Sequence, residues 1–265
     1  MYHVQELKLQ IQGQTLDYIT FGSGTQPLIM IQGLNTRGIK GAGASLAYLY
    51  RIFTKDHKVF LFDRRPDVRE GITVREMAQD IALAMDALGL TKAYVLGVSQ
   101  GGMIAQYLAV DRPDLVKKLV LAVTLSRNND TVTDVVNSWI SMAQQGDMGK
   151  LITDMAEKMY SDAYIRRYRP FLPLLTLVQK PKDVQRFTRL AKACLTCNTY
   201  ELLDQIHCPV LVLGAEQDQV VTGAASREMA EKLGCSIYMY DHLGHAAYEE
   251  AKDFNRRVLD FFHTS

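Results

Sequence analysis

The strongest chemical signal in this sequence is a serine that stands between glycines. Residues 97–101 read Gly-Val-Ser-Gln-Gly, with Ser99 at the centre, directly after the apolar run 93–96 and directly before a stretch with helical periodicity. The two glycines permit a tight, strained turn between a strand and a helix, which lifts a serine hydroxyl above the sheet. The alternative is a glycine-rich turn with a bystander serine. The strand-to-helix context favours a nucleophilic Ser99.

A serine hydroxyl is a poor nucleophile unless a base removes its proton, and that base is usually a histidine backed by a carboxylate. Two histidines, His242 and His245, lie between a predicted strand at 236–240 and the last predicted helix. Gly244 gives the backbone the freedom to turn the imidazole of His245 inward. Either histidine could instead be a loop residue bonded to backbone. We expect His245 to be the base, with His242 as its competitor.

The carboxylate is expected at the end of the strand that precedes the histidine loop. Two acids stand there, Glu216 and Asp218. Asp218 lies deeper in the loop and is followed by apolar residues that can anchor it, whereas Glu216 is expected to be solvated or to pair near a helix end. Asp130, after another predicted strand, is a more distant candidate. With Asp218, the order along the chain is Ser99, Asp218, His245, the order known for one particular fold.

The elements that must position these side chains alternate between strands and helices. Residues 4–11 and 15–21 alternate apolar and polar side chains and predict an antiparallel hairpin. Short apolar runs predict strands buried on both faces, at 27–31, 59–62, 93–98, 119–123 and 210–213. Helices are predicted at 73–88, with a capping box from Thr73 to Glu76, and at 100–110, 224–233 and 249–262. This alternation predicts an α/β fold with a mostly parallel sheet covered by helices.

The stretch from 126 to 200 breaks the alternation. It has no buried-strand pattern and is rich in helix formers, methionines and aromatic residues. We predict a core domain formed by 1–125 and 201–265 and a helical cap insertion, 126–200, over the edge where the strands end. Trp139, Met142 and Tyr160 are candidates for lining an apolar pocket there. The alternative is that these side chains only pack the cap against the sheet.

Composition excludes several classes of partner. Thirty Lys and Arg against 29 Asp and Glu leave a net charge of +1, which gives no broad attraction to nucleic acid or anionic lipid. No apolar run reaches the roughly 18 residues of a membrane span, and the first residues lack an export signal, so we expect a cytoplasmic protein without a membrane partner. The four cysteines, Cys194, Cys197, Cys208 and Cys235, are expected to be free thiols.

Taken together, these features resemble the α/β-hydrolase superfamily, and within it the lid-bearing esterase and thioesterase-like branch. The matching features are the turn at 97–101, the Asp-Arg-Arg segment at 63–65, the Gly-x-x-x-Asp segment at 214–218, and the Gly-His pair at 244–245. The match covers nearly the whole chain, although in the insertion only position and helical character agree. The resemblance implies an eight-stranded, mostly parallel sheet with a helical cap, and a catalytic triad of Ser99, Asp218 and His245 without a metal or organic cofactor.

The sequence departs from this family at two places. The loop after the third strand commonly reads His-Gly, but Gln32 stands here before Gly33. The resemblance implies that the oxyanion hole is made by the backbone N–H groups of Leu34 and Gln100, which a different side chain at position 32 need not remove. At 65–70, relatives commonly have Arg-Gly-x-Gly-x-Ser, whereas this chain reads Arg-Pro-Asp-Val-Arg-Glu. We expect a reshaped turn there.

The function that follows is a serine hydrolase of carboxylesterase or thioesterase type. It would cleave a carboxylic ester or thioester of a small, largely apolar substrate through an acyl-enzyme on Ser99, and would act as a monomer or homodimer. Two alternatives use the same residues: a carbon–carbon bond hydrolase or lyase with the same triad, and a ligand receptor with slow turnover. A purely structural protein fits poorly with a nucleophile, base and acid in this order.

Overall fold

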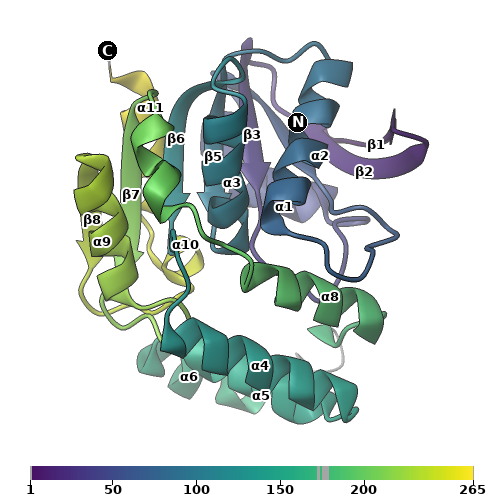
Figure 1. Cartoon of the computed structure of the whole chain (residues 1–265), viewed down its shortest axis with the longest axis vertical. Helices are drawn as coiled ribbons and strands as arrows, with labels where there is room; N and C mark the ends of the chain where they lie inside the picture. The colour runs from purple at the N-terminus through teal and green to yellow at the C-terminus, as the bar shows by residue number, and fades with distance from the viewer. Residues whose placement is uncertain (1, 172–173, 175–178, 265) are drawn as a thin grey trace.

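A sheet with helices on both faces forms the centre of the molecule (Figure 1). The computed structural model describes residues 2–171, 174 and 179–264. Within these residues the sheet has eight strands in the order β1-β2-β4-β3-β5-β6-β7-β8. Strand β2 is antiparallel to both β1 and β4, and all the other neighbouring strands are parallel. The predicted eight-stranded, mostly parallel sheet is therefore confirmed.

The strands lie close to the positions that the apolar runs predict. Their bounds are β1 Gln5–Ile11, β2 Gln14–Phe21, β3 Gln26–Ile31, β4 His57–Phe62, β5 Ala93–Val98, β6 Val116–Ala122, β7 Val210–Ala215 and β8 Ser236–Tyr240. Every residue of the central strand β5 is buried, because helices cover the sheet on both sides. The predicted hairpin is confirmed as well, with a turn at Gln12 and Gly13 between β1 and β2.

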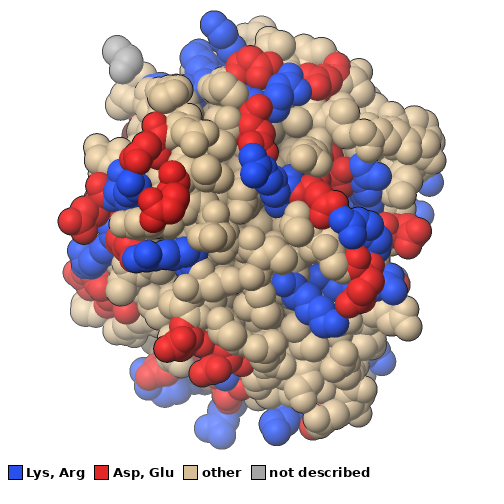
Figure 2. Space-filling model, in the orientation of Figure 1, with Lys and Arg blue, Asp and Glu red and all other residues tan. Residues whose placement is uncertain are grey.

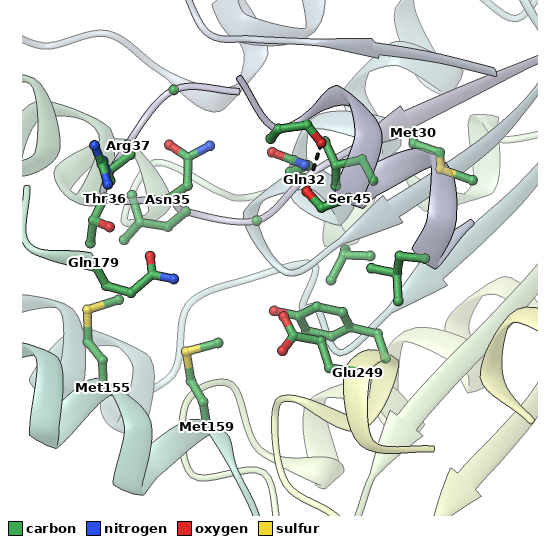
Figure 3. Close-up of a pocket in the computed structure, with 18 of the residues that line it drawn as sticks. Met30, Gln32, Asn35, Thr36, Arg37, Ser45, Met155, Met159, Gln179 and Glu249 are labelled. Atoms are coloured by element: carbon green, nitrogen blue, oxygen red, sulfur yellow. Dashed lines mark hydrogen bonds between the residues drawn. The ribbon is translucent and has the colours of Figure 1, made fainter. Parts of the chain in front are cut away.

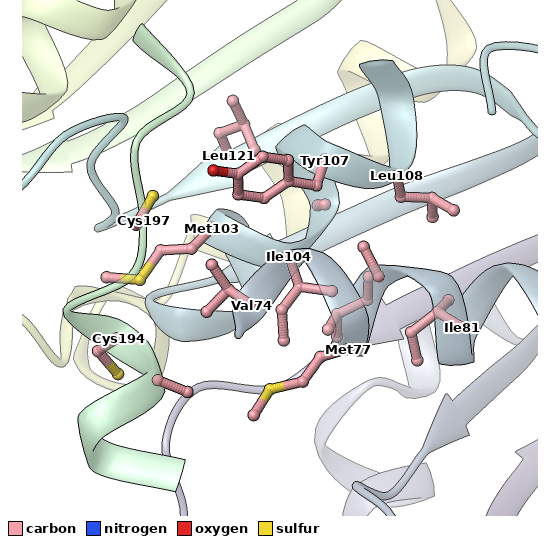
Figure 4. Close-up of a cluster of buried hydrophobic side chains, with 14 of the residues drawn as sticks. Val74, Met77, Ile81, Met103, Ile104, Tyr107, Leu108, Leu121, Cys194 and Cys197 are labelled. Atoms are coloured by element: carbon pink, nitrogen blue, oxygen red, sulfur yellow. The ribbon is translucent and has the colours of Figure 1, made fainter. Parts of the chain in front are cut away.

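Two layers of helices cover the sheet. The helices of the core are α1 Gly43–Leu49, α2 Val74–Ala87, α3 Gln100–Asp111, α9 Gly223–Leu233, α10 Ala247–Glu250 and α11 Phe254–His263. Short 3-10 helices lie at Arg51–Phe53, Arg169–Phe171 and Tyr200–Gln205. Figure 4 shows how Met77 and Ile81 of α2 lie against Ile104 and Leu108 of α3 in the larger buried cluster. The site-bearing helix α3 is thereby held between the sheet and α2.

The ends of α2 and α9 follow the predicted signals. The hydroxyl of Thr73 accepts from the Glu76 N–H at 3.1 Å, and the Glu76 carboxylate accepts from the Thr73 N–H at 3.0 Å, which completes the predicted capping box. Gly234 ends α9 in the left-handed conformation, at φ 59°. Helix α1 has no counterpart among the helices that the sequence predicts.

The prediction of one continuous helix over 249–262 is wrong. The chain forms α10 and α11 there, separated by Ala251, whose ψ of 115° is extended. Ala247 and Phe254 lie on either side of the break and are both buried in the same cluster. The apolar spacing therefore continues across the break, so periodicity gives no sign of it.

The helices between β6 and β7 gather at one end of the sheet, below the carboxyl ends of the central strands in Figure 1. They are α4 Asp130–Gln144, α5 Met148–Met159, α6 Asp162–Tyr168 and α8 Val184–Cys194. Residues 172–173 and 175–178 of the predicted insertion lie outside the described residues. In the rest of 126–200 the chain is helical or irregular, apart from an isolated bridge between Arg127 and Asn198. The division into core and cap stays a prediction.

The surface carries both charges, closely mixed. Blue and red side chains alternate over the face shown in Figure 2, and Arg112, for example, pairs with Asp86 and Asp114. In the described part of the chain, no helix has the length and apolarity needed to cross a bilayer. All four cysteines are free, as expected, and burial raises the pKa of the Cys194 thiol to about 11.

The buried His57, at the start of β4, should make the stability of the protein depend on pH. The side chain is 1% exposed and packs against the rings of Tyr94 and Phe262. Burial lowers the pKa of His57 from 6.5 to about 4. Between these two pKa values the unfolded chain binds a proton at His57 and the folded protein does not. The free energy of unfolding therefore falls as pH drops from about 6.5 toward 4. At pH 5 this loss amounts to about 2 kcal/mol.

Urea unfolding at pH 7 and pH 5 measures this loss. His57→Leu should lose about 2 kcal/mol less than wild type between the two pH values, whereas His207→Gln, at an exposed position, should behave like wild type. An equal loss of stability in His57→Leu and wild type would contradict the assignment.

Candidate active site

Ser99 lies in the strained turn between β5 and α3. Its backbone has φ 53° and ψ −121°, a conformation that L-residues rarely adopt. A Cβ on Gly97 would come within 2.6 Å of the Gly101 carbonyl oxygen, and a Cβ on Gly101 would overlap the carbonyl oxygen of Ile31. Both glycines are therefore required by the close approach of α3 to the strand ends. The Ser99 carbonyl also accepts a hydrogen bond from the Thr124 hydroxyl at 2.7 Å, which helps to fix the turn.

His245 joins Ser99 to Asp218. Its Nε2 lies 2.9 Å from the Ser99 Oγ, and its Nδ1 lies 2.8 Å from an Asp218 carboxylate oxygen. His245 is 3% exposed and Asp218 is 7% exposed. The competing His242 is exposed on the preceding turn. The three side chains that the sequence selects thus form one hydrogen-bonded chain, in which His245 and Asp218 are buried and Ser99 is partly buried.

The carboxylate of Asp218 is held from both sides. One oxygen contacts His245, and the other accepts the N–H groups of Val220 and Val221 at 2.8 and 3.0 Å. The apolar residues after Asp218 anchor it through their backbone. Glu216 pairs instead with Arg227 on α9, in agreement with the expected pairing near a helix end.

Asp130, the third acid considered, is exposed in the first turn of α4. It makes no hydrogen bond to Ser99, His245 or Asp218, whose side chains bond to one another along this chain.

The loop after β3 passes directly beside the serine. A Cβ on Gly33 would lie 3.2 Å from the Ser99 Cβ and 3.7 Å from its Oγ. Leu34, the next residue, borders both cavities at the site. Gln100 is the first residue of α3, and the first N–H groups of a helix have no acceptor inside the helix. The backbone groups expected to form an oxyanion hole therefore lie on the two segments that flank Ser99.

The side chain of Gln100 has a role that the sequence did not indicate. Its amide nitrogen donates to the Leu190 carbonyl at 2.7 Å and to the Cys194 sulfur at 3.1 Å, both on α8. At the first of the two departures from the family pattern, the Arg64 guanidinium donates to the backbone carbonyl of Gln32 at 2.7 Å. A side-chain bond to the main chain thus holds the loop in which Gln32 stands before Gly33.

The turn at 65–70 also binds α8. The guanidinium of Arg189 donates to the Val68 carbonyl at 2.7 Å, and Lys192 pairs with Glu70 at 3.0 Å. Arg186 pairs with Asp63 at 3.2 Å, in the segment just before the turn. Three basic residues, one helical turn apart on α8, therefore fasten this helix to the core beside the nucleophile.

Two cavities share part of their lining beside the loop after β3, and Ser99 lines the smaller one. The smaller has a volume of about 30 Å³ and is lined by Ser99, His245 and mainly apolar side chains, among them Val132, Val136 and Trp139. The larger, of about 750 Å³, shares with it Gly33, Leu34, Met155, Met159 and Tyr248. Figure 3 shows Met155 and Met159 of α5 pointing into the larger cavity, toward the loop that carries Asn35 and Thr36.

The three predicted pocket residues lie in different places. Trp139 lines the small cavity and donates its indole N–H to Asp154 at 2.8 Å. Tyr160 lines the large cavity. Met142 packs against the core and lines neither cavity.

Met155 and Met159 border both cavities but are not among the three pocket residues predicted from the sequence. Their spacing of four residues places them on one face of α5 and could have indicated this role. In the described residues, no three His, Cys, Asp or Glu side chains group closely enough to hold a metal ion.

The strain at Ser99 leads to a stability prediction. Glycine adopts φ 53° without the steric cost that a Cβ incurs, so Ser99→Gly should relieve the turn. Ser99→Ala keeps the Cβ and is the matched control. We expect Ser99→Gly to be more stable than Ser99→Ala by about 1 kcal/mol in urea unfolding, after the entropy cost of glycine in the unfolded chain. A less stable Ser99→Gly would show that the turn is not strained.

Comparisons with known proteins agree with this fold. A family model described as the alpha/beta hydrolase fold matches residues 26–252. The chain is 28% identical over 236 residues to a protein provisionally named carbamate hydrolase RutD, from Caulobacter sp. strain K31, covering 84% of this chain and 87% of that one. It is 21% identical over 267 residues to 3-oxoadipate enol-lactonase 2 from Acinetobacter baylyi, covering 97% and 96% of the two chains.

Solved structures show the same fold. The alpha/beta hydrolase enzyme MGS-M2, from a Medee basin deep-sea metagenome library, superposes with a TM-score of 0.86 at 20% identity over 98% of both chains. The enol-lactonase from Burkholderia xenovorans LB400 gives a TM-score of 0.85 at 20% identity, over 97% of this chain and 100% of that one. The chain therefore belongs to the α/β-hydrolase fold family and is an enzyme of that fold.

Proposed function

We propose that this hydrolase cleaves the ester or thioester bond of a small, largely apolar substrate through an acyl-enzyme on Ser99. The observation that carries the proposal is the hydrogen-bonded chain from Ser99 through His245 to Asp218, with separations of 2.9 and 2.8 Å, where Ser99 and His245 line a small cavity. An imidazole at this distance from a serine oxygen is in reach of its proton.

The first half of the reaction transfers the acyl group to the enzyme. Ser99 Oγ attacks the substrate carbonyl carbon while His245 Nε2 takes the serine proton. Asp218 holds the opposite ring nitrogen, which keeps the ring in the useful tautomer and stabilises the imidazolium. The oxyanion is expected to lie against the N–H groups of Leu34 and Gln100, each such donor being worth about 3 kcal/mol. The tetrahedral intermediate then collapses, and the leaving group departs with the proton from His245.

The second half releases the acid. A water molecule gives a proton to His245 and attacks the acyl carbonyl, and the Ser99 oxygen leaves with that proton. The free acid is the product, and the side chains return to their starting protonation states. Hydrolysis of a carbonyl–oxygen or carbonyl–nitrogen bond also agrees with the names of the relatives, which include a carbamate hydrolase and an enol-lactonase.

We also propose that helices α4, α5, α6 and α8 act as the cap over this site, within an insertion at 126–200, and that 1–125 and 201–265 form the core. In support, the cap side supplies Trp139 to the small cavity and Met155 and Met159 to both. The small cavity then holds a short acyl group, since its volume is only about 30 Å³, and the larger cavity holds the leaving group.

Substitutions at Ser99 and Asp218, in the hydrogen-bonded chain, test the mechanism. Ser99→Ala should lower kcat/KM for p-nitrophenyl acetate by about 10³-fold or more, because no nucleophile remains. Asp218→Asn should lower it by about 10³ to 10⁴-fold through loss of the correct tautomer. His242→Gln and Glu216→Gln, which alter the rejected histidine and acid, are controls expected to stay within about threefold of wild type. Wild-type turnover by Ser99→Ala would end the proposal.

The small cavity predicts a preference for short acyl chains. In a series of p-nitrophenyl esters, kcat/KM should be highest for acetate to butyrate and fall for longer chains, because Trp139 closes the cavity. Trp139→Ala should move the optimum to longer chains, whereas Met142→Ala, on the same helix but outside the lining, should not. An unchanged optimum in Trp139→Ala would place the acyl group elsewhere.

A further inference from the structure

A carboxylate stands in the wall of the larger cavity, and the proposed chemistry does not use it. Glu249 lies at the end of α10, four residues after His245 and next to Tyr248, which borders both cavities. Its side chain is exposed, and Figure 3 shows it directed into the same space as Met159. One oxygen accepts a hydrogen bond from the Tyr160 hydroxyl at 2.5 Å.

The neighbouring acid, Glu250, has a structural role that Glu249 does not share. Glu250 accepts the N–H of Ser161 at 2.8 Å and its hydroxyl at 2.6 Å, which fastens the start of α6 to the core. By contrast, no Lys, Arg or His of the described chain lies within ion-pair distance of the Glu249 carboxylate, whose hydrogen-bond partners are the Tyr160 and Tyr248 hydroxyls.

The surroundings of Glu249 disfavour the charged form of its carboxyl group. The surrounding protein, which partly desolvates the group, and the charge of Glu250 raise the pKa of Glu249. A carboxylate without an ion pair in a partly desolvated wall costs free energy unless its oxygens are bonded. Such groups in clefts are candidates for functional roles. The Tyr160 and Tyr248 hydroxyls both bond the carboxylate. A carboxylate has about four acceptor sites, so acceptor capacity remains for a ligand in the cavity that Glu249 lines.

The chemistry of the lining favours a neutral partner over a cation. Lys40 and Lys182 border the same cavity with exposed side chains, so a substrate ammonium group would meet like charges on its way to Glu249. A hydroxyl or an amide N–H meets no such repulsion and still donates a strong hydrogen bond to a carboxylate.

We propose that Glu249 is a specificity-determining residue that accepts a hydrogen bond from a hydroxyl or amide N–H on the leaving-group side of the substrate. This inference rests on the proposed function, because it treats the larger cavity as the place of the leaving group. A site that bonds a substrate donor rejects the analogue that lacks it, since the polar group of the site is then left unpaired.

Binding to Ser99→Ala protein tests the assignment without turnover. Trp139 is the only tryptophan of the chain and lines the small cavity, so its fluorescence reports on ligands at the site. The probes are ω-hydroxyalkyl acetates of graded length, each paired with the alkyl acetate that carries a methyl group in place of the hydroxyl. At one chain length or more, we expect the hydroxyl ester to bind about tenfold more tightly than its methyl partner.

Two further substitutions in the Ser99→Ala background identify the acceptor. Glu249→Leu should abolish the preference, while Tyr160→Phe should retain it, because the carboxylate stays in place without its cap contact. If Glu249→Leu does not fold, as judged by thermal unfolding, Glu249→Gln keeps the shape and should reduce the preference to about threefold. No preference at any length, or a preference that Glu249→Leu leaves unchanged, would overturn the assignment.

The test separates this inference from the proposed function. If wild type hydrolyses none of the esters but the Glu249-dependent preference is present, the hydrolase proposal fails and the assignment of Glu249 stands. If the esters are hydrolysed through Ser99 and the preference is absent, the assignment of Glu249 fails alone.

Discussion

The close approach of α3 to the ends of β3 and β5 is the constraint on which the site depends. Only glycine fits at positions 97 and 101, and the turn between them holds Ser99 at φ 53°. The strain is maintained because the fully buried strand β5 and the packed helix α3 fix the two ends of the turn. The cost of this conformation places the hydroxyl above the sheet edge, where His245 reaches it at 2.9 Å.

The histidine side of the site depends on the helices between β6 and β7. The Ala246 N–H donates to the Met159 carbonyl at 2.7 Å, directly beside His245, and Glu250 binds Ser161 just beyond. On the serine side, the Gln100 side chain binds α8. Base and nucleophile are thus each tied to the same group of helices, so a movement of these helices would alter the distance between imidazole and hydroxyl.

The sequence predicts a structural feature correctly where the residues of one short segment determine that feature by themselves. The glycines around Ser99, the capping box at Thr73 and Gly234 at the end of α9 all have a physical requirement that the residue type alone expresses. The break between α10 and α11 at Ala251 could not be predicted from the sequence, because the apolar spacing continues through it. Contacts between distant segments, such as Gln100 with Leu190 and Tyr160 with Glu249, depend on how α8 and α5 dock, which no single segment encodes. Composition suggested an apolar pocket, but the docking decides that Trp139 faces the serine and Met142 does not.

The most direct measurement of the central claim is covalent labelling with a fluorophosphonate, followed by mass spectrometry of the labelled peptide. An activated serine attacks the phosphorus, so the reagent reports on the hydrogen-bonded chain itself and not on any chosen substrate. The account predicts one label per chain, on Ser99, and a large loss of labelling rate in His245→Ala. A wild-type protein that remains unlabelled, or that is labelled at Ser99 equally fast without His245, would contradict it.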